Sequence, residues 1–342
     1  MSWRSYVSLT KPRVVVLLQI TALCAVLVHD KMFDQISMET AETMLIVFIG
    51  GYLSAGGANA INMWYDRDID PMMTRTESRP IPTGEVSAES ALAMGVVLSI
   101  AGVSWFWVFS NEVAAFWSAF SILFYVFVYS IWLKRSTPQN IVIGGIAGST
   151  PPVIGWAAAE DGLAASTESA AQMMQSLVDI GSPLPWLMFL LIFLWTPPHF
   201  WALALYRSEE YGRVGVPMLP NVKGAERTLF EMKVYAIVLI LMSLAVPSSY
   251  GGLEEGDTLY HILRWNVVGL SIWYASSVWR IDLAEERDET GRMATAARSF
   301  FVSMLYLALM FVVLVTASFG FTGAVFGAGI SLFAIIRSET RR

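Results

Sequence analysis

The sequence has little charge, a single cysteine and no excess of basic residues. Only 15% of its 342 residues are Asp, Glu, Lys or Arg, and the formal net charge is −6 at pH 7. The basic residues form no stripe, which excludes a nucleic-acid-binding surface. The lone cysteine, Cys24, excludes an intramolecular disulfide and a cysteine-based metal site. The chain also has no stretch that suggests a soluble domain, a linker or a low-complexity segment.

Apolar residues dominate instead, and they occur in long runs. Hydrophobic residues make up 55% of the chain, the mean hydropathy is +0.55, and the 13 Trp and 12 Tyr suit the interfacial belts of membrane proteins. Nine long apolar runs lie at about residues 14–28, 44–61, 88–109, 113–133, 139–158, 184–206, 229–247, 263–280 and 299–318. We therefore expect an all-α polytopic membrane protein, a bundle of nine transmembrane helices around a central cavity.

Two apolar runs have more than one interpretation. The first run has the length of a signal peptide, but no small-residue cleavage site follows it, so we expect a retained helix. A further run, at about 322–336, is Gly-rich and only ~15 residues long, so it is a short tenth span, a tilted half-helix or a surface helix. Residues 1–342 are expected to form a single membrane domain, with loops 62–87, 134–138 and 207–228 capping an active site.

The distribution of basic residues predicts the orientation in the membrane. If the N-terminus lies in the cytoplasm and the nine segments alternate, 17 of the 22 Lys and Arg residues fall on the inner side. Only Lys31 and Arg264 fall outside, and three more arginines lie at the C-terminus. Because inner loops of membrane proteins carry the excess of Lys and Arg, we expect a multi-pass protein of the cell membrane with a cytoplasmic N-terminus and cytoplasmic active-site loops.

A polar stretch from Asn59 to Gly84 begins where the second apolar segment ends. Three oxygen-bearing side chains in it are spaced four residues apart, at Asn62, Asp66 and Asp70, so on a helix they share one face. Two carboxylates and an amide suit Mg²⁺, which takes oxygen ligands and often shares them with phosphate. Arg75 and Arg79 follow, and their guanidinium groups can bind phosphate oxygens. The alternative interpretation is an ordinary charged loop held by local ion pairs.

The sixth apolar segment carries an ionisable side chain among prolines and aromatics. It contains Trp195, Pro197, Pro198, His199 and Trp201, and paired prolines kink or break a helix. An ionisable residue within a membrane segment is a functional candidate, so we expect His199 to serve catalysis; the alternative is a histidine bonded to a facing helix. The other two histidines, His29 and His261, lie near predicted outer loops and are expected to be surface residues.

The inner loop after the sixth segment offers a second set of charged groups. Glu209 and Glu210 lie near Arg213 and Lys223, and they form either a second cation-and-phosphate site or a solvated charge cluster. Acidic and basic groups on two such loops suit a diphosphate bound through Mg²⁺. An aromatic interior can hold a lipid tail and stabilise a positive intermediate. The pattern therefore favours prenyl transfer from a diphosphate to an electron-rich acceptor.

Several motifs resemble the UbiA superfamily of intramembrane prenyltransferases, and within it the branch that modifies haem. They are T-K-P-R at Thr10–Arg13, N-M-W-Y-D-R-D-I-D, M-x-R-T-x-x-R-P at Met73–Pro80, L-K-R-S-T-P-Q-N-I at Leu133–Ile141, G-G-I-A-G-S-T-P-P-V-I-G-W at Gly144–Trp156, L-W-T-P-P-H-F-W-A-L-A and G-V-P-M-L-P. The resemblance implies transfer of a farnesyl group from farnesyl diphosphate to a vinyl group of haem b, with addition of water, to give haem O for terminal oxidases.

The resemblance also implies roles for particular residues. Asn62, Asp66, Asp70 and Glu210 are expected to hold Mg²⁺, with Asp66, Asp70 and His199 in catalysis. The diphosphate is expected to bind Asn59, Arg75, Arg79, Lys134, Arg135 and Lys223. Many superfamily members carry D-x-x-x-D after the sixth segment, whereas the matching positions here are Tyr206 and Glu210, so Glu209 is an alternative second ligand. Expected partners are the two substrates, the bilayer, and a haem A synthase or terminal-oxidase assembly.

Two other functions remain open at this point. A related prenyltransferase acting on a quinone precursor or a lipid acceptor would use the same diphosphate site, although P-P-H-F-W and P-M-L-P argue against it. A membrane transporter or scaffold would use the same buried polar groups as a path for its substrate.

Overall fold

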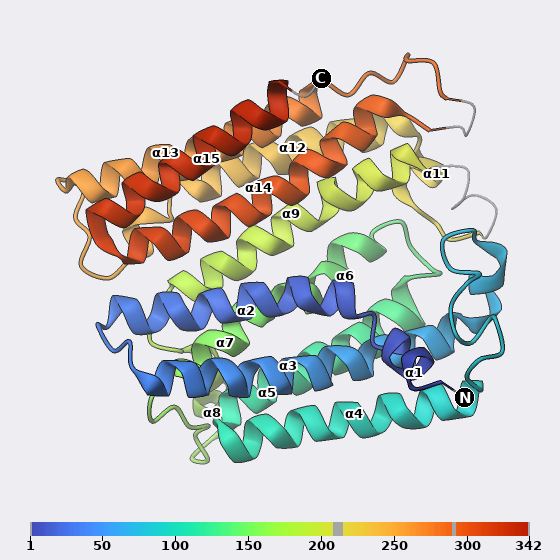
Figure 1. The fold of residues 1–342 in the computed structure, drawn as a ribbon, viewed down its shortest axis with the longest axis horizontal. Helices are drawn as coiled ribbons and strands as arrows, with labels where there is room; N and C mark the ends of the chain where they lie inside the picture. Colours follow the sequence, from blue (N-terminus) through green and yellow to red (C-terminus); the bar gives the residue numbers. More distant parts are fainter. Residues whose placement is uncertain (1, 208–214, 289–291, 341–342) are drawn as a thin grey trace. The chain divides into compact units, whose positions relative to one another are not determined.

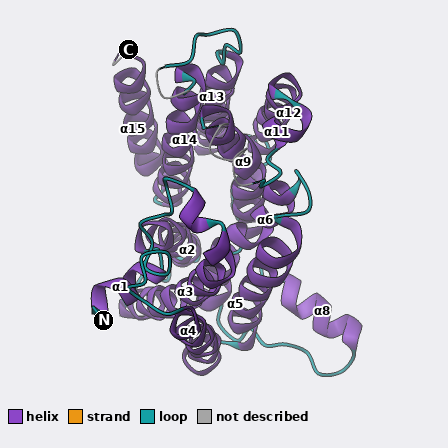
Figure 2. Cartoon of the chain, turned by 90° about the vertical axis from the view of Figure 1, so that its right-hand side faces the viewer, coloured by secondary structure: helices purple, strands orange, loops and turns teal. Residues whose placement is uncertain are grey.

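Long helices account for nearly all of the regular structure. A computed structural model describes residues 2–207, 215–288 and 292–340, and helix is the only regular secondary structure in these ranges (Figure 2). The chain divides into two compact units. The first consists mainly of Met1–His29 and Ile36–Gly181, and the second contains Asp30–Gln35 and most of the chain from Ser182 onward.

The first unit contains the helices up to α8, in the blue-to-green part of Figure 1. They are α1 (Trp3–Leu9), α2 (Pro12–Met32, whose last turn belongs to the second unit), α3 (Met38–Tyr65), η1 (Asp66–Asp68), η2 (Asp70–Met72), α4 (Ala88–Phe109), α5 (Glu112–Leu123), the π-helical η3 (Phe124–Leu133), α6 (Asn140–Ser149), α7 (Pro151–Ala159) and α8 (Ala170–Val178). The short α8 was not expected from the sequence.

The second unit contains the remaining helices. They are α9 (Leu184–Tyr206), α11 (Leu219–Lys223), α12 (Ala225–Ser243), η4 (Pro247–Ser249), α13 (Thr258–Trp279), α14 (Ala294–Ser318) and α15 (Gly320–Thr340). Pro197 and Pro198 lie inside α9, which continues through them rather than breaking.

Eight helices are long and apolar enough to cross a membrane, within the parts of the chain that the structure describes. The all-helical membrane fold is thus confirmed, but the count of nine is not. Helices α12 and α13 fall outside the eight. Helix α12 carries charged residues such as Glu231 and Lys233, and α13 carries Arg264. The Gly-rich run at 322–336 belongs to α15, which at 21 residues is long enough to span a bilayer.

Polar caps and glycines fit the long helices together. Ser37 caps α3 in a reciprocal capping box with Thr40, which satisfies two otherwise free backbone donors. Helices α3 and α4 lie side by side in the first unit (Figure 1), and glycines let their backbones approach closely. A Cβ atom on Gly57 of α3 would lie 2.5 Å from Ser99 Oγ and 2.8 Å from Gly95 O of α4. In the second unit, a Cβ on Gly327 of α15 would lie 2.1 Å from Thr316 Oγ1 of α14.

Replacing Gly57 with Ala is expected to force α3 and α4 apart, because the new methyl group meets backbone atoms of α4. Overpacking of this kind costs about 1–3 kcal/mol, so the melting temperature of the purified protein in detergent should fall. Gly148→Ala is the matched control, since a Cβ at Gly148 of α6 meets no atom within 4 Å. Equal melting temperatures for the two variants would contradict close packing at Gly57.

Candidate functional site

Asp66 and Asp70 lie just beyond the last turn of α3, and both are buried. Their exposed fractions are 1% and 2%. The helix ends at Tyr65, and the chain continues through the two 3₁₀ turns η1 and η2. The expectation that one regular helix carries both aspartates is therefore wrong. The physical reason is Pro71, which disfavours the α conformation at the residue before it and offers no N–H to continue the helix.

Arg79 binds the carboxylate of Asp70 through a two-pronged contact. One guanidinium nitrogen, Nη1, donates to both Asp70 Oδ1 and Asp70 Oδ2 at 2.7 Å. The Thr76 hydroxyl donates to the Asp70 carbonyl at 2.8 Å, which folds the intervening segment back on itself. Because a buried carboxylate without a cation is costly, this pairing explains how Asp70 is tolerated inside the protein.

Lys134 binds the second carboxylate, that of Asp66. The Lys134 Nζ donates to Asp66 Oδ2, and burial lowers the pKa of Lys134 although Asp66 partly offsets that effect. The other carboxylate oxygen, Asp66 Oδ1, is buried and accepts no hydrogen bond from a described residue. Its neighbouring cation, Arg135, lies 3.7 Å away through Nη2. One carboxylate oxygen is therefore hydrogen-bonded, whereas the other lies near Arg135 without a hydrogen bond and can accept one from another ligand or bind a cation.

Lys11 is a further cation in this cluster, and the sequence predicted no site role for it. Its Nζ donates to Asn62 Oδ1 at 2.8 Å, while Asn62 Nδ2 donates to Ser130 Oγ at 3.0 Å. Burial, together with the charges of Arg79 and Lys134, lowers the pKa of Lys11 to about 7. The sequence signal that could have singled out Lys11 is its place in the T-K-P-R motif, directly before a proline.

The backbone of Lys11 is in the left-handed region, with φ of +51°. That conformation costs a residue with a side chain about 1–2 kcal/mol, and glycine is the usual choice just after a helix such as α1. Lysine at this position is therefore explained by its side chain rather than by its backbone. A face of α3 holds the turn in place: Asn59 Nδ2 donates to Thr10 O at 3.2 Å, and Tyr52 shares a hydrogen bond of 2.9 Å with the Thr10 hydroxyl.

The remaining residues predicted to bind diphosphate or metal do not all lie in this buried cluster. Arg135 binds Asp68 through two contacts of 2.6 and 2.7 Å and stacks over the Tyr65 ring, so it ties the 134–138 loop to the end of α3. Arg75 is exposed and makes no ion pair with a described residue. Lys223 is exposed at the end of α11 in the second unit. Glu209 and Glu210 lie outside the described residues.

His199 is buried within the second unit, in the middle of α9. Its ring stacks on Trp195, with centroids 4.1 Å apart, and on Phe300 of α14, at 4.6 Å. The Nδ1 atom lies 2.6 Å from Ser303 Oγ. The same stretch of α14 accepts a hydrogen bond from Trp195 Nε1 at the Ser303 carbonyl, at 2.8 Å. The imidazole is thus fixed on both faces and at one nitrogen.

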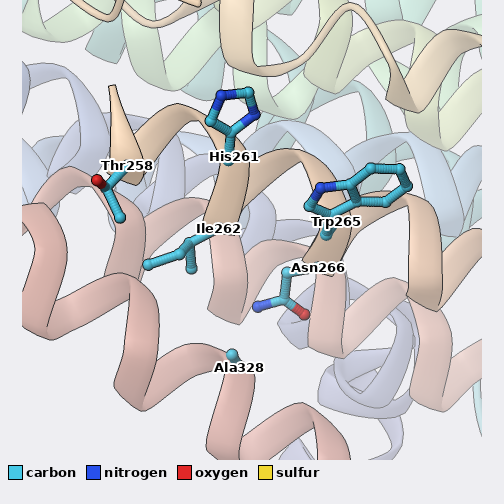
Figure 3. A pocket seen from close by; sticks show the side chains of 6 residues that line it. All are labelled: Thr258, His261, Ile262, Trp265, Asn266 and Ala328. Atoms are coloured by element: carbon cyan, nitrogen blue, oxygen red, sulfur yellow. The ribbon is translucent and has the colours of Figure 1, made fainter. Parts of the chain in front are cut away.

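The other two histidines differ from each other. His261 is exposed on α13, as expected, where it lines a cavity of about 440 Å³ together with Trp265, Asn266 and their neighbours (Figure 3). The expectation that His29 is a surface residue is wrong, because it is 2% exposed. Its Nε2 pairs with Glu160 Oε2 at 3.0 Å and its ring meets Trp156 edge-on, so a partner at the end of α7 makes its burial possible.

The donor set at the end of α3 fits magnesium, although each donor also has a cation partner. Within the described ranges no three His, Cys, Asp or Glu side chains are grouped so as to hold a metal ion. Magnesium does not require such a group, because it commonly takes one or two carboxylates and completes its shell with waters and substrate phosphates. Asp66 Oδ1, which is buried and accepts no hydrogen bond from a described residue, is an acceptor of the required kind. Asn62, Asp66 and Asp70 are therefore the residues that would hold the ion.

The helical fold and this buried cluster of carboxylates and cations define a class of intramembrane enzyme. Residues 17–293 match the model of the UbiA prenyltransferase family, and the chain belongs to that family. The predicted resemblance is thus confirmed at the level of the family.

Individual relatives narrow the similarity further. The chain is 42% identical over 325 residues to the protoheme IX farnesyltransferase of Hyphomonas neptunium, covering 94% of each chain. It is 43% identical over 312 residues to that of Afipia carboxidovorans, covering 90% of this chain and 88% of the relative. Protoheme IX farnesyltransferases are also called haem O synthases. The predicted resemblance to the haem-modifying branch of the family is therefore confirmed.

Solved structures share the fold at low sequence identity. A digeranylgeranylglyceryl phosphate synthase aligns with a TM-score of 0.67 and 16% identity, covering 93% of this chain and 99% of its own. A UbiA homologue from Archaeoglobus fulgidus bound to DMAPP and Mg²⁺ aligns with a TM-score of 0.60 and 16% identity, covering 91% and 99%. At such identities these structures support the arrangement of helices and nothing finer.

Proposed function

We propose that this chain transfers the farnesyl group of farnesyl diphosphate to a vinyl group of haem b, producing haem O. The carbon–oxygen bond to diphosphate breaks, and a carbon–carbon bond forms to the terminal vinyl carbon. Water adds to the other vinyl carbon and a proton is released. The observation that carries the proposal is the similarity, over nine-tenths of the chain, to proteins described as protoheme IX farnesyltransferases.

The cluster at the end of α3 supplies the diphosphate site in this proposal. Asn62, Asp66 and Asp70 hold Mg²⁺, which would neutralise negative charge on the departing diphosphate. Lys134 and Arg79 bring their charges to the same place, because each is already bound to one of the aspartates. Such fixed charges stabilise a leaving anion without reorganising during the reaction.

Other predicted residues have supporting roles. Arg75 is exposed and unpaired with any described residue, so it is available to the diphosphate directly. Asn59 and Arg135 position the surrounding backbone, since each binds a neighbouring loop. Lys223 and Glu210 belong to the diphosphate and metal sites by the same proposal, and His199 serves the acceptor.

The membrane setting completes the proposal. We place the N-terminus and the active-site loops on the cytoplasmic side, because 17 of the 22 Lys and Arg residues then lie there. Lipid around the helices limits access of water, which would otherwise capture the farnesyl group. The product haem would pass to a haem A synthase or a terminal-oxidase assembly.

The proposal is tested by supplying both candidate acceptors to the purified protein. With farnesyl diphosphate and Mg²⁺, haem b should be converted to haem O, detected by chromatography and mass. 4-Hydroxybenzoate offered in its place should be left unchanged. Haem left unchanged while the phenol is prenylated would replace this function with that of a quinone-precursor prenyltransferase. Neither reaction, with binding of either compound retained, would favour a transporter or scaffold.

Magnesium and a diphosphate analogue should stabilise the protein together more than the sum of their separate effects. The reason is that Mg²⁺ alone must compete with Lys11, Lys134 and Arg79 for its ligands, whereas a diphosphate gives those cations a new anionic partner. When the ligands are supplied together at about 100 times their joint dissociation constant, binding adds ~2.7 kcal/mol to the free energy of unfolding. That gain is measurable as a rise in melting temperature. Equal and independent shifts would contradict a shared site.

A further inference from the structure

The ring of His199 is held in one orientation by contacts from two helices. Trp195 and Phe300 cover its two faces at interplanar angles of 21° and 23°, so the ring cannot rotate without leaving the sandwich. Trp195 is four residues before His199 on α9, and Phe300 lies one turn before Ser303 on α14. His199 is 7% exposed. An imidazole fixed in this way presents only its edge to any ligand.

Hydrogen bonding at Ser303 selects the tautomer of this imidazole. The Ser303 hydroxyl donates to the Phe300 carbonyl at 2.6 Å, and the same Oγ lies 2.6 Å from His199 Nδ1. A serine hydroxyl has a single proton, so both contacts are satisfied together only when Nδ1 carries hydrogen and donates to Ser303 Oγ. The other nitrogen, Nε2, then has a free lone pair, and it makes no hydrogen bond to a described residue.

A neutral imidazole with Nδ1–H bound to an oxygen and Nε2 free is the form in which histidine binds a metal. The partner at Nδ1 fixes the tautomer and makes Nε2 a better donor. Haem iron is a common partner for such a nitrogen. In the proposed reaction the acceptor substrate brings its own iron.

We propose that His199 Nε2 is an axial ligand to the iron of the haem b substrate, with Ser303 as its positioning residue. The inference rests on the proposed function, because haem enters only as the acceptor of that reaction. Ligation would fix the distance between the iron and α9. Other contacts would then determine how the porphyrin is rotated about the iron–nitrogen bond. His199 thereby selects metalloporphyrins over metal-free porphyrins.

The test titrates haem b and metal-free protoporphyrin IX separately into the purified full-length protein and records absorption and magnetic circular dichroism spectra. The wild type should show a histidine-ligated haem spectrum. His199→Ala should lose that spectrum and weaken haem b binding by at least about tenfold, the lower end of the loss that follows when even an outer partner of a metal ligand is removed. Binding of protoporphyrin IX should be unchanged, because that compound has no iron. Added imidazole should restore the ligated spectrum.

Two further variants separate ligation from a structural role. Ser303→Ala keeps the ligand but removes its partner, so the spectrum should stay histidine-ligated while affinity for haem b falls less than in His199→Ala. His261→Ala removes an exposed histidine and should change nothing. His199→Gln is used if the alanine variant does not fold, as judged by its melting temperature, with the same expected loss of the ligated spectrum.

Three outcomes would overturn the inference. One is a wild-type haem spectrum that His199→Ala and His199→Gln leave unchanged. Another is an equal loss of haem b and protoporphyrin IX binding, which would make His199 a wall of the pocket. If the wild type still forms haem O in either case, only the ligation is wrong. The third outcome is a wild type that neither binds haem b nor converts it, in which case the proposed function fails as well.

Discussion

Asp66→Asn should abolish haem O formation while leaving membrane insertion intact. The substitution keeps the shape of the side chain but removes the charge that pairs with Lys134 and the acceptor strength of the free Oδ1. On the proposed function, both losses weaken the site that receives charge from the departing diphosphate. Removal of a single charge-stabilising group typically costs about 10²–10³-fold in turnover, and loss of metal binding adds to that figure. Initial rates with saturating farnesyl diphosphate and haem b measure the effect.

Asp34→Asn makes the same chemical change at an exposed carboxylate and is the matched control. The Asp34 side chain is 90% exposed, and its left-handed backbone suits asparagine equally well. Its turnover should equal that of the wild type. Normal amounts of haem O from Asp66→Asn, with the control also active, would show that the metal assignment is wrong.

Arg79→Gln should give the second large effect, this time on stability as well as activity. Arg79 is the only described cation that hydrogen-bonds the Asp70 carboxylate, whose side chain is 3% exposed. Removing one partner of a buried ion pair typically costs about 3–5 kcal/mol, because the other charge is left without compensation. Arg79→Lys should fall between the variant and the wild type, since lysine keeps the charge but loses the planar guanidinium. Melting temperature in detergent and initial rate measure the two effects.

A double variant distinguishes the two roles of this pair. Asp70→Asn combined with Arg79→Gln leaves no buried charge unpaired, so much of the stability lost in Arg79→Gln should return. Activity should not return, because both the metal ligand and the guanidinium are absent. Recovery of activity together with stability would mean that the pair supports the fold and takes no part in diphosphate binding.

Hydropathy predicts most of the helices of this fold but not how many cross the membrane. Runs of 18 or more apolar residues end close to the helix ends in the structure, as for 184–206 and α9. The count of nine spans is not confirmed, and the difference lies in α12, α13 and α15. Charged residues on α12, and Arg264 with uncharged polar residues such as His261 and Asn266 on α13, lower the hydropathy of these two helices. Helix α15, by contrast, extends beyond its apolar run at both ends to reach 21 residues. Composition within a window does not reveal where a helix begins and ends.

The sequence identified most residues of the candidate site but not how they are arranged. The four-residue spacing picked out Asn62, Asp66 and Asp70, and the structure brings cations to all three. The spacing also implied a regular helix, which Pro71 prevents. Lys11 was missed because it is separated by 51 residues from its partner Asn62, and no local pattern reports a contact over that distance. His29 was misplaced for the same reason, since its partner Glu160 is 131 residues away.

Lys11 lies in the turn after α1 and brings that turn to Asn62, one of the residues proposed to hold Mg²⁺. Leu9 belongs to one buried cluster with Ala60 and Met63, and the Ser5 hydroxyl donates to Glu85 Oε2 at 2.6 Å, so α1 is held at two points just before the lysine. Substitutions that loosen α1 would therefore displace Lys11 and disturb the proposed magnesium site as well as the fold.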